Sequence, residues 1–287
     1  MQGLRRVSIM MFIIALSAFI TFTIYSKTSE DKLGPRIYMD DEVIEASVKD
    51  NEKKLLKDVT AKDARDGNVT DSLVVENLSN FTSKGRRLIT YAAFDSHRNV
   101  GKATRELRYT DYESPEFVMK EAPQISQSEL NSMNQFSEII QATDCLDGDI
   151  TRSISIMATS DYEEAEFGGK QVVKFQVANS AGDVENIPVT VAFNEAGAPV
   201  AELSSYIVYM KKGQSFDPNG YLKDIRVNNN ELTLTAFHEE YEDGTLTIKN
   251  GVNTANPGVY QVVYTVTTGE GSRLRGGMAY LQVIVRD

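Results

Sequence analysis

A ten-residue phrase occurs twice in this chain, and each copy is followed by the same glycine-led passage. The phrase occupies residues 61–70 (AKDARDGNVT) and 142–151 (ATDCLDGDIT), an offset of 142 − 61 = 81 residues. The passage occupies residues 85–91 and 169–175, an offset of 169 − 85 = 84 residues. A third copy of the passage lies at residues 258–264, without the acidic phrase before it. Because self-similarity at a fixed spacing indicates a repeated structural unit, the sequence predicts three repeats built on one plan.

The glycine-led passage alternates between apolar and more polar residues. In its first copy, Ile89, Tyr91 and Ala93 alternate with residues such as Leu88 and Thr90, and the other two copies keep this order. A period of two places alternate side chains on opposite faces of a β-strand. One face then packs and the other meets solvent, as in antiparallel sandwiches. The Asp-Gly pairs of the acidic phrases suit turns between strands. The sequence therefore predicts an all-β chain of three sandwiches.

The N-terminal segment has the composition of a membrane span. Residues 7–25 carry no charge and follow Arg5 and Arg6. At about 1.5 Å per residue, a helix of this length crosses a bilayer core of about 30 Å. We interpret residues 7–26 as an uncleaved transmembrane signal anchor that contacts the lipid bilayer, after a cytoplasmic tail of residues 1–6. The arginines favour a cytoplasmic N-terminus, which places the C-terminal domains outside the membrane.

A cleaved signal peptide is the alternative for the same segment. The apolar region of such a peptide usually spans about 7–15 residues and ends in a small-x-small site. The best site here, residues 15–17 (Ala-Leu-Ser), would leave the apolar residues 19–22 at the mature end. The sequence therefore favours the anchor.

Proline marks the boundaries between the predicted domains. Ser114-Pro115 and Pro199 stand at the two junctions, where proline cannot donate a ladder hydrogen bond and restricts the residue before it. The predicted parts after the anchor are a stalk and three immunoglobulin-like domains: residues 27–36, 37–112, 113–195 and 196–287.

Two local features complete this organisation. Residues 126–129 (Ser-Gln-Ser-Glu) could cap one helical turn, and no long amphipathic helix follows the anchor. Cys145 is the single cysteine, so no intrachain disulfide can form and hydrophobic cores must supply the stability. We expect Cys145 to be a free surface thiol, with an intermolecular disulfide or a covalent cap as the alternatives.

The motifs of the first two repeats resemble a known family. The acidic phrase, the glycine-led strand, the following residues 98–101 (Arg-Asn-Val-Gly), Asp111 and Pro115 resemble bacterial immunoglobulin-like domains, found in tandem on surface proteins and in some pesticidal crystal toxins. They are also similar to hyalin repeats. The third repeat keeps residues 215–218 (Ser-Phe-Asp-Pro) and 257–266 but lacks the acidic phrase.

This resemblance covers residues 37–287. It implies a bacterial cell surface, a β-sandwich of about seven strands in each repeat, and usually no catalysis. It identifies no ligand, because sandwiches host many functions.

Charge is concentrated in the middle repeat. The chain carries a formal charge of −11, and residues 112–194 hold 14 acidic and 4 basic side chains, which gives 4 − 14 = −10. Such a module should repel nucleic acid and anionic lipid surfaces. We therefore predict no nucleic-acid partner. A solubilising role is the alternative to attraction of cations or of a basic partner.

The sequence contains few candidate catalytic residues. The chain has two histidines, His97 and His238, and neither stands in a His-x-x-x-His or His-Glu-x-x-His spacing that would indicate zinc. The chain also lacks a nucleophile elbow and a glycine-rich phosphate loop. We predict that the protein is not an enzyme and holds no cofactor other than a possible calcium ion.

The acidic phrases offer the oxygen ligands that calcium prefers. Calcium takes about six to eight oxygen ligands at about 2.3–2.6 Å. A calcium site requires the turn at residues 66–68 to fold beside the turn at 95–99. The spacing is not that of an EF-hand, and turn chemistry alone is the alternative explanation. The candidate ligands are Asp63, Asp66, Asn68 and Asp95 in the first repeat, and Asp144, Asp147, Asp149 and Asn179 in the second.

These observations predict a membrane-anchored extracytoplasmic protein that acts as a cell-surface spacer or as a structural or adhesion protein. One alternative is a module that binds a carbohydrate, such as cell-wall polymer, or a surface protein. Tyr206, Tyr209, Tyr221 and Tyr241 of the third repeat suit recognition if they are exposed, or sandwich core if they are buried. Another alternative is an accessory subunit of an envelope complex. Loss of the acidic phrase makes the third repeat the best candidate for a separate task.

Overall fold

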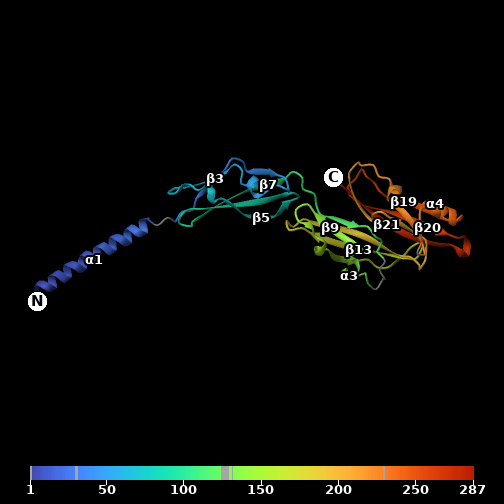
Figure 1. Cartoon of the computed structure of the whole chain (residues 1–287), viewed down its shortest axis with the longest axis horizontal. Helices are drawn as coiled ribbons and strands as arrows, with labels where there is room; N and C mark the ends of the chain where they lie inside the picture. The colour runs from blue at the N-terminus through green and yellow to red at the C-terminus, as the bar shows by residue number, and fades with distance from the viewer. Residues whose placement is uncertain (1, 30–31, 124–128, 131, 229) are drawn as a thin grey trace. The chain divides into compact units, whose positions relative to one another are not determined.

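The computed structural model describes residues 2–29, 32–123, 129–130, 132–228 and 230–287 (Figure 1). The chain divides into two compact units. The N-terminal compact unit comprises residues 1–46, 50–79 and 86–109, and the C-terminal compact unit comprises residues 47–49, 80–85 and 110–287. The first holds most of the first repeat, and the second holds the second and third repeats.

A long helix, α1 (Gln2–Ser29), begins the chain. Its residues 5–25 have a mean hydropathy of 2.4, and none of this span is buried. Leu, Met and Ala favour the helix, and no Gly or Pro interrupts residues 4–33. The hydroxyl groups of Ser17, Thr21 and Thr23 donate to helix carbonyls at 2.7–2.9 Å, so the helix satisfies them internally. By length and composition the helix can cross a membrane, a test that a signal sequence would also pass.

The helix extends beyond the segment expected from composition. It includes residues 2–6, expected as a tail, and residues 27–29, expected as part of the stalk. At the other end of that stalk, Arg36 already begins a strand. The connection between helix and sheet is therefore shorter than the sequence suggested.

The first repeat contains two sheets, of strand order β1-β3-β4 and β2-β7-β6-β5. The chain passes from one sheet to the other after β1, since β1 pairs antiparallel with β3 while β2 pairs parallel with β7. A short helix, α2, and a 3-10 turn, η1, lie between strands. The bounds are β1 Arg36–Met39, β2 Val43–Ala46, α2 Glu52–Leu55, β3 Val59–Asp63, β4 Gly67–Asn68, η1 Thr70–Ser72, β5 Val74–Ser83, β6 Arg86–Phe94 and β7 Val100–Tyr109.

Inward-facing residues from both sheets of the first repeat share one core. Ile89, Tyr91 and Ala93 of β6 are all fully buried, which confirms the period-two pattern predicted for this strand. They pack in the same cluster as Ala61 of β3 and Leu107 of β7. Burial of these apolar side chains supplies the main stabilising term of the repeat.

A buried arginine holds α2 against this core. The Tyr91 hydroxyl donates to the Leu55 carbonyl at 2.7 Å, and Arg105 Nε donates to the Tyr91 oxygen at 2.8 Å. Arg105 Nη2 also donates to the carbonyls of Leu55 and Lys57 at 3.1 and 3.2 Å. The guanidinium thus offsets its desolvation with hydrogen bonds to three acceptors, as a buried charge requires.

The second repeat has the sheet β10-β9-β8 and a second sheet in which β13 pairs with β11, β12 and β14. A four-residue helix, α3, precedes β9. The predicted helical cap at residues 126–129 lies largely outside the described residues. The bounds are β8 Glu116–Met119, α3 Met133–Phe136, β9 Ile140–Asp144, β10 Gly148–Asp149, β11 Ser155–Thr159, β12 Glu163–Glu164, β13 Gly169–Ala178 and β14 Val184–Phe193.

The third repeat returns to the plan of the first, with sheets β15-β17-β18 and β16-β21-β20-β19. Here β16 pairs parallel with the last strand, β21, as β2 does with β7. The bounds are β15 Val200–Leu203, β16 Ile207–Lys211, η4 Pro218–Tyr221, β17 Leu222–Val227, β18 Asn230–Leu232, α4 Leu234–Glu240, β19 Thr245–Asn250, β20 Gly258–Thr268, η5 Gly271–Arg273 and β21 Arg275–Arg286.

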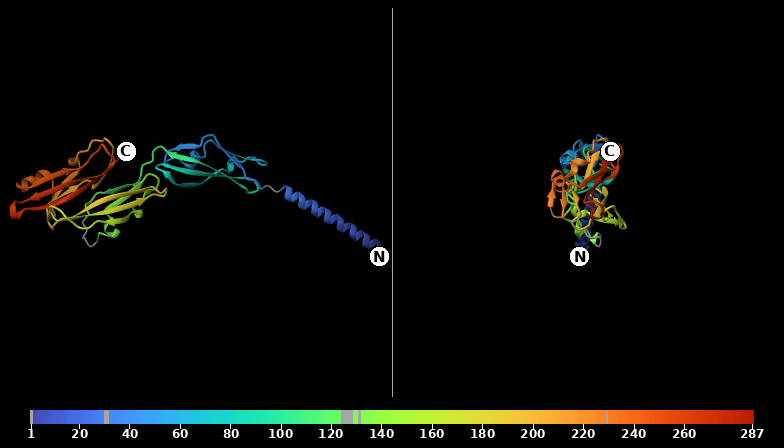
Figure 2. Two further views of the ribbon diagram at one scale, coloured as in Figure 1. Left: turned by 180° about the vertical axis from the view of Figure 1, so that it is seen from behind. Right: turned by 90° about the vertical axis from the view of Figure 1, so that its right-hand side faces the viewer.

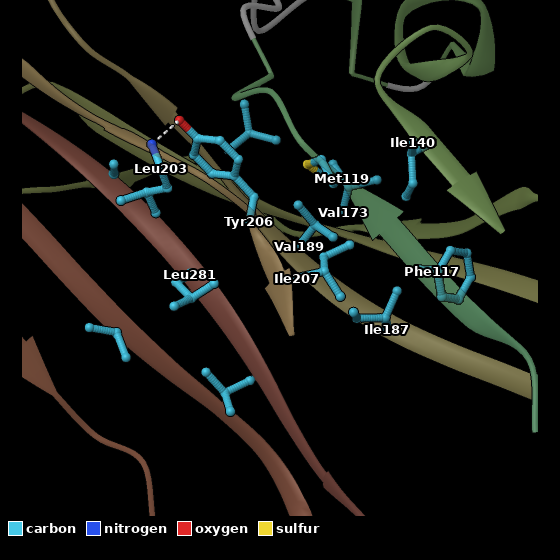
Figure 3. Close-up of a cluster of buried hydrophobic side chains, with 14 of the residues drawn as sticks. Phe117, Met119, Ile140, Val173, Ile187, Val189, Leu203, Tyr206, Ile207 and Leu281 are labelled. Atoms are coloured by element: carbon cyan, nitrogen blue, oxygen red, sulfur yellow. Dashed lines mark hydrogen bonds between the residues drawn. The ribbon is translucent and has the colours of Figure 1, made fainter. Parts of the chain in front are cut away.

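The second and third repeats share one continuous core. Ile187 and Val189 of β14 belong to the same buried cluster as Ile207 of β16 and Leu281 of β21 (Figure 3). Figure 2 shows the second repeat, green to yellow, beside the third, orange to red. The backbone N–H of Tyr206 donates to the Met119 carbonyl at 2.8 Å. This differs from the sequence analysis, which expected residues 113–195 and 196–287 to be two distinct domains.

Arg286, at the end of β21, fastens the two repeats together. Its guanidinium nitrogens lie 3.0 and 3.1 Å from carboxylate oxygens of Glu116 and Glu185. It also donates to the Pro115 carbonyl at 2.8 Å and lies 4.1 Å from the centre of the Tyr209 ring. One cation thereby contacts the start of β8, the strand β14 and the strand β16.

Candidate functional site

The first acidic phrase forms a tight turn between β3 and β4. Asp63, the last residue of β3, accepts hydrogen bonds at Oδ1 from the backbone N–H groups of Arg65 and Asp66, at 2.7 and 3.0 Å. These bonds lower the pKa of Asp63 from its usual value. Gly67 follows with a φ of 75°, in the left-handed region that glycine tolerates. The aspartate and the glycine thus make the turn that the sequence predicted.

Asp66 reaches across to the turn between β6 and β7. Its carboxylate accepts hydrogen bonds from the backbone N–H of Ser96 at 2.6 Å and from the Ser96 hydroxyl at 3.0 Å. The backbone bond, with the hydroxyl bond second, lowers the pKa of Asp66. The sequence required these two turns to meet for a cation site, and the structure confirms that they do.

Asp95 organises the second turn from within. It is 8% exposed and accepts from the backbone N–H groups of His97 and Asn99 at 2.9 and 2.7 Å. Its other oxygen accepts from the Asn99 side-chain amide at 2.7 Å. Both carboxylate oxygens are therefore engaged in holding the turn.

One group of potential cation ligands results. Asp66, Asp95 and His97 each offer a ligand atom, and these atoms lie within 4.8 Å of one another. The sequence analysis did not predict His97 as a ligand, because His97 belongs to no histidine pair. Its position two residues after Asp95 was the signal that could have identified it. Asp63 and Asn68 are not in this group: Asn68 Oδ1 accepts instead from the Thr70 backbone N–H at 3.0 Å.

The second repeat reproduces the turns with a different set of side chains. Asp144 Oδ1 accepts from the backbone N–H groups of Leu146 and Asp147 at 2.9 and 3.1 Å. The Asp147 carboxylate accepts from the backbone N–H and hydroxyl of Ser180 at 2.5 and 2.7 Å. Asp149 accepts from the Thr151 backbone N–H at 2.9 Å.

Asn179 stands where the first repeat has Asp95. Its side-chain amide donates to Asp144 at 3.1 Å and to the Tyr112 hydroxyl at 2.8 Å. Tyr112 in turn donates to Asp183 at 2.7 Å, and burial is the main cause that raises its pKa. An amide donor replaces a carboxylate here, so the two repeats offer different sets of ligands to a cation.

These contacts define what the turns can do chemically. A carboxylate presents about four lone-pair positions, so an oxygen that accepts one N–H can still bind a cation. The hydrogen bonds nevertheless account, without any ion, for the aspartate, glycine and serine residues that recur in both repeats. Structural turn chemistry explains each contact, and calcium binding stays a prediction.

The tyrosines of the third repeat divide into two groups. Tyr206 is 3% exposed and lies in the shared core (Figure 3). Tyr209 is partly buried against the same core and packs under Arg286. Both therefore follow the core interpretation. Tyr221 and Tyr241 are half-buried, stacked respectively on Phe216 and tilted against Phe237.

A cavity of about 480 Å³ lies beside the strand β14 in the C-terminal compact unit. Thr190 and Ala192 of β14 and Ala279 and Tyr280 of β21 contribute to its lining. In the first and third repeats the last strand carries a parallel strand at its far edge, whereas β14, among the described residues, pairs only with β13. Pro188 suits this edge because it donates no ladder hydrogen bond.

Cys145 is exposed, as the sequence predicted. Its Sγ donates to the Glu113 carbonyl at 3.1 Å. Burial raises the pKa of the thiol, which makes it a weaker nucleophile at neutral pH.

Comparison with known proteins gives one sequence relative. No family model matches the chain. The pesticidal crystal protein Cry22Aa of Bacillus thuringiensis is 27% identical over 219 residues, which covers 74% of this chain and 28% of that protein. The chain thus spans less than a third of the length of this relative. The match agrees with the resemblance seen in the acidic phrases, and the family assignment itself stays a prediction.

Solved structures with adhesion and carbohydrate-binding domains are also similar. The Drosophila N-cadherin EC1-3 structure matches with a TM-score of 0.24 and 12% identity, over 90% of both chains. The structure of CBM51-2 in complex with GlcNAc and INT domains from Clostridium perfringens ZmpB matches with a TM-score of 0.22 and 11% identity, over 88% of this chain and 42% of that one. TM-scores this low do not establish a common arrangement of the whole chain.

Proposed function

We propose that this chain is a membrane-anchored extracytoplasmic protein whose tandem immunoglobulin-like repeats act as a cell-surface spacer or adhesion element. The observation that carries the proposal is the exposed apolar span of residues 5–25, followed within a few residues by β-sheet. A helix with no buried face needs an apolar environment, and a bilayer supplies one. The repeats then project from the membrane surface at which the C-terminal end of the helix emerges.

The charge and packing of the C-terminal compact unit support this role. The second repeat carries 4 − 14 = −10 charges over residues 112–194, which keeps an exposed module soluble and holds it away from anionic surfaces. The shared core of the second and third repeats gives a stiff body without a disulfide. A spacer needs both properties, and it needs no catalytic step; accordingly we propose that the protein is not an enzyme.

The experiment that tests the anchor is fractionation of cells that express the full chain. We expect the protein to stay with membranes after an alkaline carbonate wash, and its intact mass to include residues 1–26. A version with residues 1–26 replaced by a cleavable signal peptide serves as the control and should be released. Recovery of the natural chain in soluble form, shortened at its N-terminus, would establish a cleaved signal peptide instead.

A binding module is the second candidate, favoured by the cavity beside β14. The edge of β14, which among the described residues pairs only with β13, and the cavity of about 480 Å³ together suit an extended protein segment or a polymer chain. Pull-down with purified cell-wall polymer and with surface proteins tests this role. Ala192→Arg should block the cavity and abolish capture, whereas Ala158→Arg on the exposed face of β11 should not. Equal capture by both variants would show that the cavity is not the binding site.

The role of accessory subunit makes a different demand. It requires that α1 and the residues up to Arg36 cannot be exchanged for an unrelated anchor without loss of function. Full function with an unrelated anchor would exclude it.

Calcium binding at the acidic turns is a subordinate proposal. If the turns bind calcium, millimolar calcium should raise the melting temperature, because a ligand that binds only the folded state stabilises it. Asp66→Ala should remove the increment that comes from the first repeat, and Asp147→Ala the increment from the second. An unchanged melting temperature in the natural chain would leave turn chemistry as the whole explanation.

A further inference from the structure

The first repeat is held close to the end of α1. Gly34 and Pro35 lie directly on the start of β7: a Cβ added to Gly34 would sit 2.4 Å from the Val100 carbonyl oxygen, and one added to Gly101 would sit 1.7 Å from the Pro35 oxygen. From Gly34 onward the chain is therefore part of the folded repeat. Ser29 ends the helix, and the five intervening steps of chain span at most about 18 Å.

The residues at this end of the repeat can be identified from its contacts. Val100 and Gly101 directly follow the β6–β7 turn, and Ser96 of that turn bonds Asp66 of the β3–β4 turn. Arg36 pairs with Lys62 just before the β3–β4 turn. We call this end the helix-side rim. It consists of residues 32–36, 62–66 and 94–100.

The rim presents apolar side chains to solvent. Leu33 is 73% exposed, Phe94 41% and Val100 43%. Phe94 and Val100 are direct cross-strand partners in the β6–β7 pair. Phe94 and Val100 thus form an exposed apolar pair at this end of the repeat, of the kind that can enter the boundary between headgroups and acyl chains.

Basic side chains surround these apolar groups. The rim carries five basic residues, and all five are exposed: Lys32, Arg36, Lys62, Arg65 and Arg98. Its three carboxylates, Asp63, Asp66 and Asp95, instead accept hydrogen bonds from backbone N–H groups of the turns. The rim thus carries five cations and three carboxylates, a net charge of 5 − 3 = +2, in contrast to the strongly acidic second repeat.

We infer that the helix-side rim binds the lipid surface, with Arg65 and Arg98 on headgroup phosphates and Leu33, Phe94 and Val100 at the boundary with the acyl chains. Cations combined with apolar groups are the composition that binds anionic interfaces. The inference rests on the proposed anchor, because the short connection brings the rim within reach of the headgroups. The first repeat then stands on the membrane as a fixed base instead of hanging from a flexible stalk.

The test uses the full chain in vesicles that contain phosphatidylglycerol. In a Cys145→Ser background, a fluorophore is attached at Val100→Cys, and headgroup spin-labelled lipid serves as quencher. The matched control is Leu88→Cys on the same sheet, since Leu88 and Val100 are both 43% exposed. Leu88 and Phe94, the cross-strand partner of Val100, are separated by six residues of β6, about 20 Å. We expect quenching at position 100 to exceed that at position 88 by about threefold or more, because nearby basic residues draw the rim to the surface.

Charge reversal separates lipid binding from mere proximity. Arg65→Glu with Arg98→Glu should reduce quenching at position 100 to the level at position 88, whereas Lys53→Glu on α2 should not. Equal quenching at the two positions, or no effect of the double substitution, would overturn the inference. Near-ultraviolet circular dichroism of the tyrosines checks that each variant is folded. Vesicle flotation keeps the two proposals apart, because a chain that fails to float refutes the anchor, while a chain that floats without differential quenching refutes only the rim.

Discussion

At the residue scale, Arg286 joins the second and third repeats, although the sequence analysis did not single it out. Its two carboxylate partners, Glu116 and Glu185, lie about 170 and 100 residues earlier in the chain and belong to the second repeat. A half-buried cation that satisfies two carboxylates and a carbonyl oxygen is stable only while all of them are in place. Removal of the guanidinium leaves Glu116 and Glu185 close together without a counter-charge.

We therefore expect Arg286→Ala to destabilise the C-terminal compact unit by about 1–3 kcal/mol, less than the loss of one partner from a fully buried ion pair, because these side chains keep partial contact with solvent. Urea denaturation followed by tyrosine fluorescence measures the change. Arg286→Lys is the matched variant and should recover only part of the stability, because lysine cannot make the forked contacts of arginine. A change within about 0.5 kcal/mol for Arg286→Ala would show that Arg286 is an ordinary surface residue.

Acid should weaken the first repeat through its turn carboxylates. Hydrogen bonds from Ser96 and from the turn backbone lower the pKa values of Asp66 and Asp63 in the folded state. A group with a lowered folded-state pKa adds stability above its unfolded pKa, and that stability is lost as the pH falls through the folded-state value. We expect the melting temperature of the first repeat to decrease as the pH is lowered below about 5. Asp66→Asn should flatten this dependence of melting temperature on pH. A pH dependence that Asp66→Asn leaves unchanged would contradict the assignment.

At the scale of elements, the junction of residues 34–35 with β7 depends on the absence of a side chain. A Cβ at Gly101 would meet the Pro35 carbonyl oxygen at 1.7 Å, and both groups belong to backbone that cannot move aside cheaply. We expect Gly101→Ala to cost about 1–3 kcal/mol and to loosen the connection between α1 and the first repeat. Hydrogen exchange at residues 32–36 reports the loosening. Gly220→Ala is the control, because nothing lies within 4 Å of a Cβ there. Equal stability of the two variants would mean that the contact adds nothing.

The elements that could be predicted from sequence are those set by local patterns. The alternation around Tyr91 places β6 correctly, and the Asp-Gly pairs place the turns, because both depend on residues within a few positions of one another. The meeting of Asp66 with the β6–β7 turn entered the sequence analysis only as a condition for a calcium site. His97 and the buried Arg105 were not, since their roles arise only when strands distant in sequence come together. No local sequence pattern indicated that β14, among the described residues, pairs only with β13.

At the scale of the whole molecule, the sequence predicted three modules, while the core joins the second and third repeats. Tyr206 and Ile207 follow the junction at Pro199 and enter the same cluster as Ile187 and Val189. No periodic pattern in the sequence reports this packing, because the apolar faces of both repeats look like ordinary strand faces. Their union follows from the complementarity of two surfaces.

We expect the part of the chain beyond α1 to unfold in two calorimetric transitions, one for each compact unit. Repeats that share a core lose their packing together, so residues 110–287 should melt as a single cooperative unit with equal calorimetric and van't Hoff enthalpies. Val189→Ala should then shift this whole transition and leave the other in place. Three separate transitions, or a Val189→Ala shift confined to part of the second transition, would show that the second and third repeats are independent.

The sidedness of Cys145 tests the central claim of an anchored, outward-facing protein most directly. The thiol is exposed, and because partial burial raises its pKa, labelling needs excess reagent and a long reaction near neutral pH, where maleimide stays selective for thiols. A membrane-impermeant maleimide added to intact cells should label the natural chain in the membrane fraction and leave Cys145→Ser unlabelled. Labelling that occurs only after the cells are broken open would place the repeats on the inner side of the membrane and contradict the account.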